Sequence, residues 1–218
     1  MRKIVGIVIV LLVSLYVADT LFLGLAERRL TGLARSAAPD ASEIHTTIGK
    51  PLLRIGDKTI LHKPVIFDIL TGRLPSAEIR LLDVTAGQVP IDEVVVRVDG
   101  VEIDGSLLLR NHRLAVKKLK GASVTLDTSA AALSTITSRP VKIRNGAIIV
   151  STPIGKVPAT VLVTRDRRLV ITPAGGAPQT FRIADDKILP CTPTAKVRQP
   201  SLTLSCSVTK VPNHFLGM

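Results

Sequence analysis

The stretch IDEVVVRVDGVEID, Ile91 to Asp104, decides the predicted fold. From Val94 to Asp99 its side chains alternate, so that three valines share one face and the other face is mixed. A period of two is the pattern of a half-buried β-strand. Further strands are expected in residues 42–50, 76–87, 121–129, 140–152, 159–172 and 201–209. The chain is therefore expected to form a long antiparallel sheet with a few short helices against one face.

Turn and cap signals support this reading. Asn145-Gly146 lies between two apolar runs and predicts a two-residue β-hairpin. A second hairpin is expected to turn at Arg165 to Arg168. Ser129 suits the N-cap of a short helix. From Asp19 to Ala37, leucines and alanines recur at three- and four-residue steps, which predicts one helix that runs into the domain.

The composition predicts an aliphatic core and an anionic partner. Hydrophobic residues make up 46% of the 218 residues, whereas aromatic residues make up 2% and Trp is absent. The formal net charge is +12, which suits nucleic acid, anionic lipid or an acidic polymer, and also suits plain solubility. Nucleic acid is not an expected partner, because the chain lacks aromatic residues on which bases stack.

The N-terminus, residues 1–26, reads as a signal peptide or a membrane anchor. Arg2 and Lys3 precede an uncharged apolar run, and Asp19 interrupts its continuation to Ala26. Cleavage after Ala26 and an uncleaved segment of about 20 residues that spans the membrane both fit. Either alternative places the remaining chain outside the cytoplasm, anchored to the outer face of the plasma membrane or free in a periplasm-like space. Without Arg2, Lys3 and Asp19 the net charge is +11.

Two cysteines agree with export. Cys191 and Cys206 are the only ones in the chain, and in an oxidising compartment they are expected to form a disulfide. Cys206 alternates with polar residues in SLTLSCSVT, which places it on the buried face of a strand. The alternative is a pair of reduced, buried thiols.

The segment KPVIFDILTGRL, Lys63 to Leu74, is a candidate for a lipid groove. Pro64 suits the start of a short helix and Gly72 suits its end. Only Asp68 interrupts the apolar residues between them, whereas a surface helix would show a polar face. The segment is therefore either a buried plug or a wall against an apolar ligand. The groove candidates are Val65, Ile66, Phe67, Ile69 and Leu70.

Basic residues supply candidates for contact with lipid headgroups or a membrane surface. Arg73 follows the apolar segment, where it would bond a phosphate or cap the short helix. The run RNHRLAVKKLK would attract an anionic bilayer, or would form a solvated strand edge. Its basic residues are Arg110, Arg113, Lys117, Lys118 and Lys120. The four His are scattered, and no motif of a metal site, a nucleophile or a phosphate loop occurs. We therefore expect no cofactor, no metal and no enzymatic activity.

The motifs, taken in order, resemble the LmeA-like phospholipid-binding proteins of the actinobacterial cell envelope. The resemblance covers most of the chain. It rests on ADTLFLGLAERRL (18–30), KPVIFDILTGRLPSAEIRLLDV (63–84), VVVRVDGVEID (94–104), ASVTLDTSAAAL (122–133), the Asn-Gly hairpin, and LPCTP with LTLSCSVTKVP near the C-terminus.

The resemblance implies an α+β fold similar to tubular lipid-binding domains. In that fold a strongly curved antiparallel β-sheet wraps on a long N-terminal helix, with short extra helices, and residues 27–218 would form this single domain. It also implies phospholipid binding, with lipid transfer as a variant, in support of lipoglycan or envelope assembly. The alternative is a non-enzymatic envelope scaffold that recruits a membrane glycan or lipid synthase, with an envelope glycosyltransferase as its partner.

Overall fold

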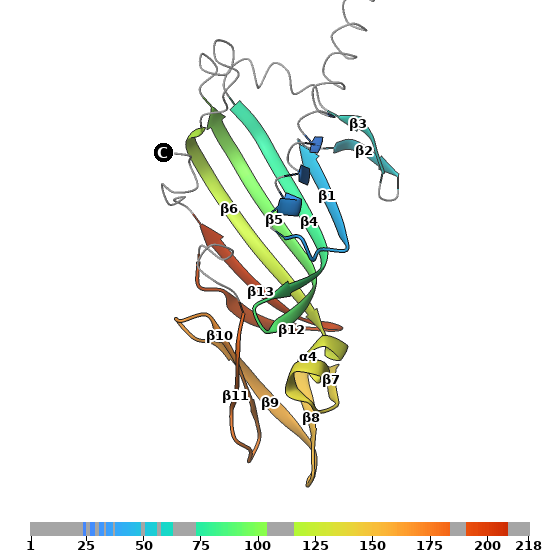
Figure 1. Ribbon diagram of the computed structural model, residues 1–218, viewed down its shortest axis with the longest axis vertical. Coiled ribbons are helices and arrows are strands. Elements are labelled where there is room, and N and C mark those ends of the chain that lie inside the picture. The colour runs from blue at the N-terminus through green and yellow to red at the C-terminus, as the bar shows by residue number, and fades with distance from the viewer. Residues whose placement is uncertain are drawn as a thin grey trace, which may run out of the picture.

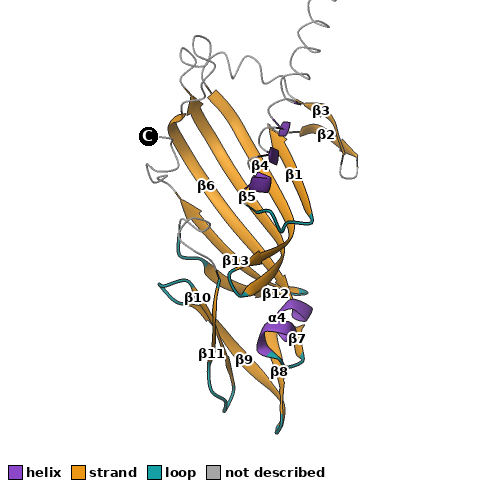
Figure 2. Cartoon of the chain, in the orientation of Figure 1, coloured by secondary structure: helices purple, strands orange, loops and turns teal. Residues whose placement is uncertain are grey.

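The computed structural model is an elongated molecule made mostly of antiparallel strands (Figure 1). A six-stranded sheet forms one end, and a five-stranded sheet forms the other (Figure 2). A hairpin of β2 (Pro51–Ile55) and β3 (Lys58–His62) lies beside the first sheet. The structure describes residues 24, 27–28, 31–32, 34–36, 38–48, 51–55, 58–62, 73–103, 116–183 and 191–208.

The six-stranded sheet has the order β1-β4-β5-β6-β13-β12, with antiparallel neighbours throughout. Its long strands β4, β5 and β6 contain 14, 15 and 14 residues. At about 3.3 Å per residue they each extend roughly 45–50 Å. The strands are β1 (Glu43–Ile48), β4 (Arg73–Ala86), β5 (Val89–Ile103), β6 (Val116–Ser129), β12 (Thr194–Arg198) and β13 (Ser201–Val208).

The five-stranded sheet is an up-and-down meander in the order β11-β10-β9-β8-β7. The predicted Asn145-Gly146 hairpin is confirmed, and both turn residues have the positive φ, 50° and 72°, that such turns need. The second predicted hairpin is also confirmed, because β9 and β10 pair around residues 164–167. The strands are β7 (Val141–Arg144), β8 (Ala147–Thr152), β9 (Gly155–Val163), β10 (Arg168–Pro173) and β11 (Gln179–Arg182).

Helix α4 (Ala130–Thr137) connects the two sheets. Ser129 is its N-cap, as predicted, because the Ser129 hydroxyl accepts a hydrogen bond from the Ala132 amide at 3.3 Å. The Asp92 carboxylate on β5 accepts bonds from the Ser129 amide and hydroxyl. Leu133 is fully buried, so the helix is anchored at its N-terminus and by an apolar side chain.

The β4–β5 hairpin bends at Asp83, a non-glycine residue with a φ of 52°. Before the bend, Leu81 pairs with the buried Val94; beyond it, the buried pair is Val84 and Ile91. The inward-facing positions therefore change parity at the bend. As a result, the tip of the hairpin reaches the five-stranded sheet, where the Gln88 amide donates to the Arg182 carbonyl oxygen at 2.9 Å.

The core lies where the two sheets and α4 meet, and it is aliphatic as predicted. Each sheet supplies a layer of buried side chains from alternate positions. Its largest fully buried side chains are Ile91, Leu126, Leu133, Ile148, Leu169, Ile171, Ile183, Leu202 and Leu204.

The predicted α+β fold with a long N-terminal helix is wrong. Apart from α4, the helical residues of the described chain are 24, 27–28, 31–32 and 34–36. Gly24 and Gly32 are poor helix formers, and the Thr31 and Ser36 hydroxyls donate to backbone carbonyls four residues earlier. The second sheet and α4 cover the core half of the apolar face that a long helix was expected to cover.

The predicted transmembrane helix is also not supported. Within the described part of the chain, no helix is both long enough and apolar enough to cross a membrane. Residues 1–23, on which the prediction of a signal peptide or anchor depended, lie outside that part.

Candidate functional site

The half of the six-stranded sheet away from the core has one apolar face. Residues that pair across strands share a face, and positions two apart along a strand share it too. The register therefore aligns two rows across five strands. One is Thr46, Ile79, Val96, Val124 and Cys206, and the other is Ile48, Ala77, Val98, Ala122 and Val208.

Burial along this face is uneven beyond the core: Ile48, Val124 and Cys206 are at most 8% exposed, whereas other members of the two rows are only partly buried. Val94, Leu126 and Leu204 are at most 5% exposed and pack against the second sheet. One or two pairs further along, several apolar side chains are only partly buried: Ile79, Val96, Val98, Ala122 and Val208. The five-stranded sheet touches the six-stranded one through β12, and α4 touches β5 and β6. The partly buried rows thus extend beyond the region where the two sheets pack together.

The helical residues near Glu27 cover the free edge of β1. The Glu27 carbonyl oxygen accepts from the Thr46 hydroxyl at 3.2 Å and from the Thr31 hydroxyl at 2.8 Å. A Glu27 carboxylate oxygen lies 3.4 Å from the Ile48 amide, and the Thr31 and Thr46 hydroxyls are 2.9 Å apart. These contacts protect an open sheet edge and form a wall at one side of the apolar rows.

The opposite face of the same strands is polar. Glu78 bridges two arginines, with a carboxylate oxygen 2.5 Å from Arg80 Nε and the other 2.7 Å from Arg97 Nε. Arg80 also reaches Glu93, at 3.3 Å. Burial raises the pKa of the Glu78 carboxyl, but the hydrogen bonds and charges of Arg80 and Arg97 outweigh it and hold that pKa below its ordinary value. The sheet is therefore amphipathic, with charges on one side and aliphatic rows on the other.

A polar groove of about 800 Å³ lies between the helical residues and the β1 edge. Four carboxylates face it, against the cations of Arg28 and Arg80 and the imidazole of His45. Arg80 is already held by Glu78 and Glu93, so the groove does not suit a phosphate. The charged and titratable residues that line it are Glu27, Arg28, Glu43, His45, Glu78, Arg80 and Glu93. Within the described residues, no group of His, Cys, Asp and Glu is arranged to hold a metal ion.

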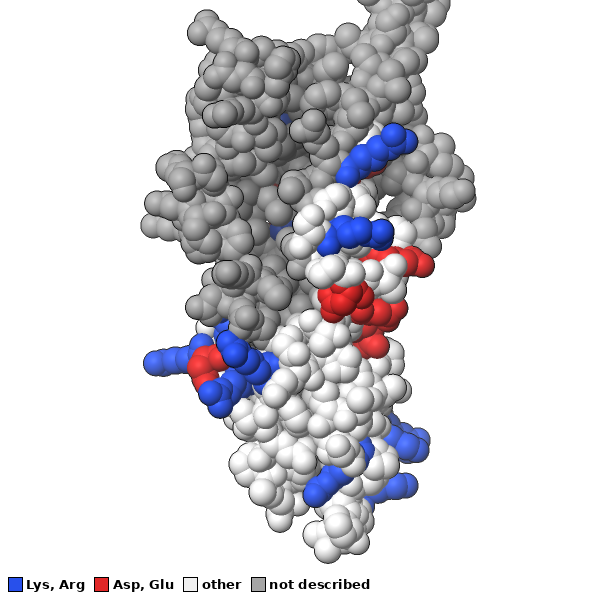
Figure 3. All heavy atoms as spheres, in the orientation of Figure 1, with Lys and Arg blue, Asp and Glu red and all other residues white. Residues whose placement is uncertain are grey.

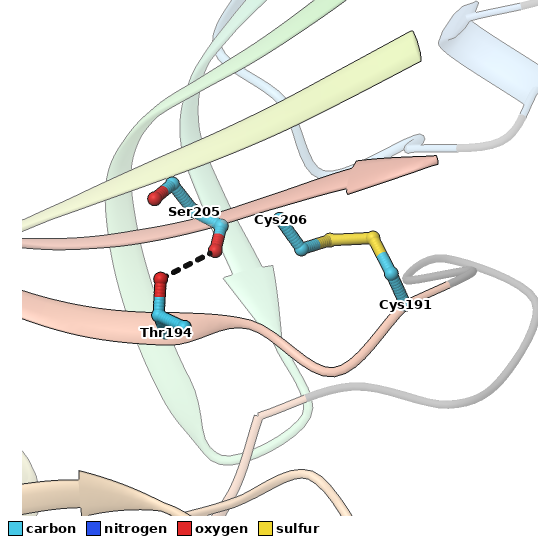
Figure 4. The surroundings of a disulfide bond; sticks show 4 residues. All are labelled: Cys191, Thr194, Ser205 and Cys206. Atoms are coloured by element: carbon cyan, nitrogen blue, oxygen red, sulfur yellow. Dashed lines mark hydrogen bonds between the residues drawn. A yellow bond between two sulfur atoms is a disulfide. The ribbon is translucent and has the colours of Figure 1, made fainter. Parts of the chain in front are cut away.

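The Cys191–Cys206 disulfide is confirmed. The bond joins the segment before β12 to the buried face of β13, and the two Cα atoms are 5.9 Å apart (Figure 4). Beside it the Thr194 hydroxyl donates to the Ser205 carbonyl oxygen at 3.1 Å. Cys206 pairs with Val124 in the apolar rows, so the disulfide fixes one side of the apolar face.

The groove candidates Val65, Ile66, Phe67, Ile69 and Leu70 lie outside the described residues, as do Arg110 and Arg113. Lys117 and Lys118 lie on β6, although their side chains are outside the description. Arg73 is exposed at the start of β4. Its pairing partner Glu102 also pairs with Lys118, so the sheet brings two of the predicted headgroup residues into one row. The exposed Lys120 lies against Gly100, where an added Cβ would be 2.6 Å from Lys120 Cδ.

Sequence reasoning missed the apolar rows as a candidate site. The signal was present, because Val96 and Val98 were assigned to one face of a strand. What the sequence did not indicate is that this face continues past the core. Comparisons of the chain with protein-family models, curated proteins and solved structures gave no match, so the resemblance to LmeA-like proteins stays a prediction.

Proposed function

We propose that the protein binds phospholipid, with the acyl chains along the apolar face of the six-stranded sheet. The observation that carries this proposal is the pair of mainly apolar rows from β1 to β13, in which Ile79, Val96, Val98, Ala122 and Val208 are only partly buried. The rows around Val96 and Val98 offer dispersion contacts without polar groups, and acyl chains require only such contacts.

The size of the surface fits this ligand. Five adjacent strands at about 4.8 Å spacing span roughly 19 Å, which is close to the length of an extended acyl chain. Each methylene transferred from water to such a surface contributes about 0.8 kcal/mol when fully buried. A surface that covers only part of each chain would still retain a two-chain lipid.

The proposed setting is the cell envelope. An oxidising, exported location is compatible with the Cys191–Cys206 disulfide. Together with the resemblance to LmeA-like proteins, this favours a non-enzymatic role in which the protein holds or transfers phospholipid at the outer face of the plasma membrane. That role would support lipoglycan or envelope assembly.

The test is native mass spectrometry of residues 27–218, secreted from a bacterial host and purified without detergent. We expect a discrete added mass that solvent extraction identifies as phospholipid. Val96→Asp should lose this mass, because a carboxylate on the apolar face repels acyl chains. Val95→Asp is the matched control, since Val95 lies on the opposite face, between Arg80 and Thr125 in the register.

Two outcomes would overturn the proposal. One is a bare protein mass with no uptake from liposomes. The other is equal retention in folded Val96→Asp and Val95→Asp proteins. Should Val96→Asp fail to fold, Val98→Asp places the same charge one row further from the core and keeps the comparison.

A scaffold that recruits an envelope glycosyltransferase is the second candidate. It is favoured by the solid packing between the sheets, where Leu126, Ile148 and Leu169 are at most 1% exposed. A bare mass in the same experiment supports it, and cross-linking in cells would then identify the partner protein.

A further inference from the structure

The positive charge of the described chain is concentrated in one of its two halves. Residues 130–183, which form α4 and the five-stranded sheet, contain eight basic residues and a single acidic one, Asp166, a net charge of +7. The strands of the six-stranded sheet carry eight basic and eight acidic residues. The basic residues of the first set are Arg139, Lys142, Arg144, Lys156, Arg165, Arg167, Arg168 and Arg182.

The far end of this half is exposed and carries a single charged residue. In an up-and-down meander the β8–β9 and β10–β11 turns come to the same end of the sheet, which is the lower end in Figure 1. Every residue of Pro153–Lys156 and Ala174–Pro178 is exposed, and Lys156 is the only charged one. Ile154, at the tip of the first turn, is 83% exposed.

Turn formation does not require isoleucine at this position. Pro153 presets its own φ, and the Thr152 hydroxyl closes the turn by donating to the Gly155 carbonyl oxygen at 2.8 Å. The β7–β8 turn, at the other end of β8, uses Asn145-Gly146, the usual choice for a two-residue hairpin. Ile154 therefore exposes a large apolar side chain at a position where a small polar residue would serve the fold better.

Basic side chains lie at this tip and along the strand beside it. Lys156 is the second residue of the return strand β9, and Lys142 points from β7 to the same outer face of the sheet. Arg144 also points to that face, but from the opposite end of β7, beside the β7–β8 turn. Arg139 lies between α4 and β7. None of these four makes an ion pair with another described residue. In Figure 3 the lowest part of the molecule is white, and the charged side chains nearest to it are blue.

We propose that this end of the five-stranded sheet docks onto an anionic lipid bilayer. Ile154 enters the boundary between headgroups and acyl chains, and Lys142 and Lys156 contact lipid phosphates. A single exposed isoleucine is common on protein surfaces. Here the isoleucine occurs together with a tip whose single charge is Lys156, with nearby cations that form no ion pair with another described residue, and with a net charge of +7. These features match the two layers of an anionic membrane. The docking surface is separate from the apolar rows and does not depend on the lipid-binding proposal.

The first experiment uses the absence of Trp from the chain. In Ile154→Trp the new indole is the only one, so its emission reports on that position alone. With vesicles of phosphatidylcholine and phosphatidylglycerol we expect a blue shift, and a much smaller shift with phosphatidylcholine alone. Leu162→Trp is the matched control, because Leu162 is 49% exposed on β9 near the opposite end of the sheet. It should show no shift.

Flotation with the same vesicles measures the size of each contribution. Ile154→Asn should lower the partition coefficient roughly tenfold, the effect of removing one buried aliphatic side chain, whereas Leu162→Asn should not change it. The double variant Lys142→Gln and Lys156→Gln should lower binding about thirtyfold and should abolish the preference for anionic vesicles.

The proposal is overturned if wild-type protein does not float with anionic vesicles. It is also overturned if the Ile154→Trp variant binds while its indole emission shows no shift, or if Ile154→Asn and the double variant bind as wild type does. In the last case the membrane would be contacted elsewhere. Native mass spectrometry of the same variants separates the two proposals, because phospholipid retention should be unchanged in all of them.

Discussion

Gly87 joins β4 to β5, and its replacement by alanine tests how the two sheets are held together. The residue has a φ of 65°, and a Cβ atom built on it would lie 2.6 Å from the Arg182 carbonyl oxygen. The Arg182 carbonyl belongs to the backbone, so it cannot rotate away as a flexible side chain could. Gly175, in the β10–β11 turn, has a φ of 70° but has nothing within 4 Å of an added Cβ. Gly175→Ala is therefore a matched control for the conformational cost alone.

The magnitudes follow from these contacts. A non-glycine residue in the left-handed region costs about 1–2 kcal/mol, and the lower entropy of the unfolded chain offsets part of it. Gly175→Ala should therefore lose about 1 kcal/mol. Gly87→Ala should also push the turn away from β11. This would break the bond from the Gln88 amide, 2.9 Å, and that from the Arg182 amide to Gln88 Oε1, 3.1 Å. At about 1 kcal/mol each, the total loss reaches about 3 kcal/mol.

Thermal unfolding followed by circular dichroism distinguishes the two variants. For a chain of this size 1 kcal/mol corresponds to about 2–4 °C in Tm. We therefore expect Gly87→Ala to lower Tm by about 6–12 °C and Gly175→Ala by about 2–4 °C. Equal losses would show that the β4–β5 turn is not held against β11, and the described junction between the sheets would then be wrong.

Two further predictions concern the disulfide and the charged face. Replacing Cys191 and Cys206 together by alanine should cost about 3 kcal/mol, given a sequence separation of 15. A reducing agent should lower the Tm of the wild type to that of the double variant and leave the variant's Tm unchanged. An unchanged Tm of fully reduced wild type would contradict this. Glu78 has a folded-state pKa below that of an unfolded glutamate. Its stabilising contribution to the fold is therefore complete at pH values above the unfolded pKa and is lost as the pH falls through the folded-state pKa. Glu78→Gln should lower the free energy of unfolding in urea at pH 7 by less than about 1 kcal/mol, and the difference should shrink towards pH 3; a pH-independent difference would argue against the paired carboxylate.

The strands and turns were predictable because they depend on local chemistry. Alternation located β5, β6 and β13, and the Asn145-Gly146 pair located a hairpin. Ser129 was recognised as an N-cap because its short hydroxyl satisfies an amide of the first helical turn. Each of these signals acts within a few residues, so no tertiary information was needed.

The partition of the strands into two sheets was not predictable, because alternation shows which face is apolar but not what covers it. The bend at Asp83 illustrates this limit. Positive φ is uncommon for any residue other than glycine, although aspartate adopts it more often than most, and here the Asp83 carboxylate accepts from the Ser42 hydroxyl at 2.7 Å, 41 positions away in the sequence. This bend carries the hairpin tip to the second sheet. A leucine-rich helix was expected to fill the place that the second sheet and α4 take.

Ionic strength should separate the two proposed contacts with lipid. Acyl chains held by Val96, Val98 and their neighbours are retained by burial of apolar surface, which salt of ordinary concentration does not weaken. Docking through Lys142 and Lys156 depends on exposed charges and should weaken as the Debye length falls from about 10 Å at 0.1 M to about 3 Å at 1 M. If one wild-type preparation keeps its lipid in high salt but leaves anionic vesicles, binding and docking are distinct surfaces. If both are lost together, the retained lipid would be part of the docking contact, and the acyl-chain site on the six-stranded sheet would be refuted.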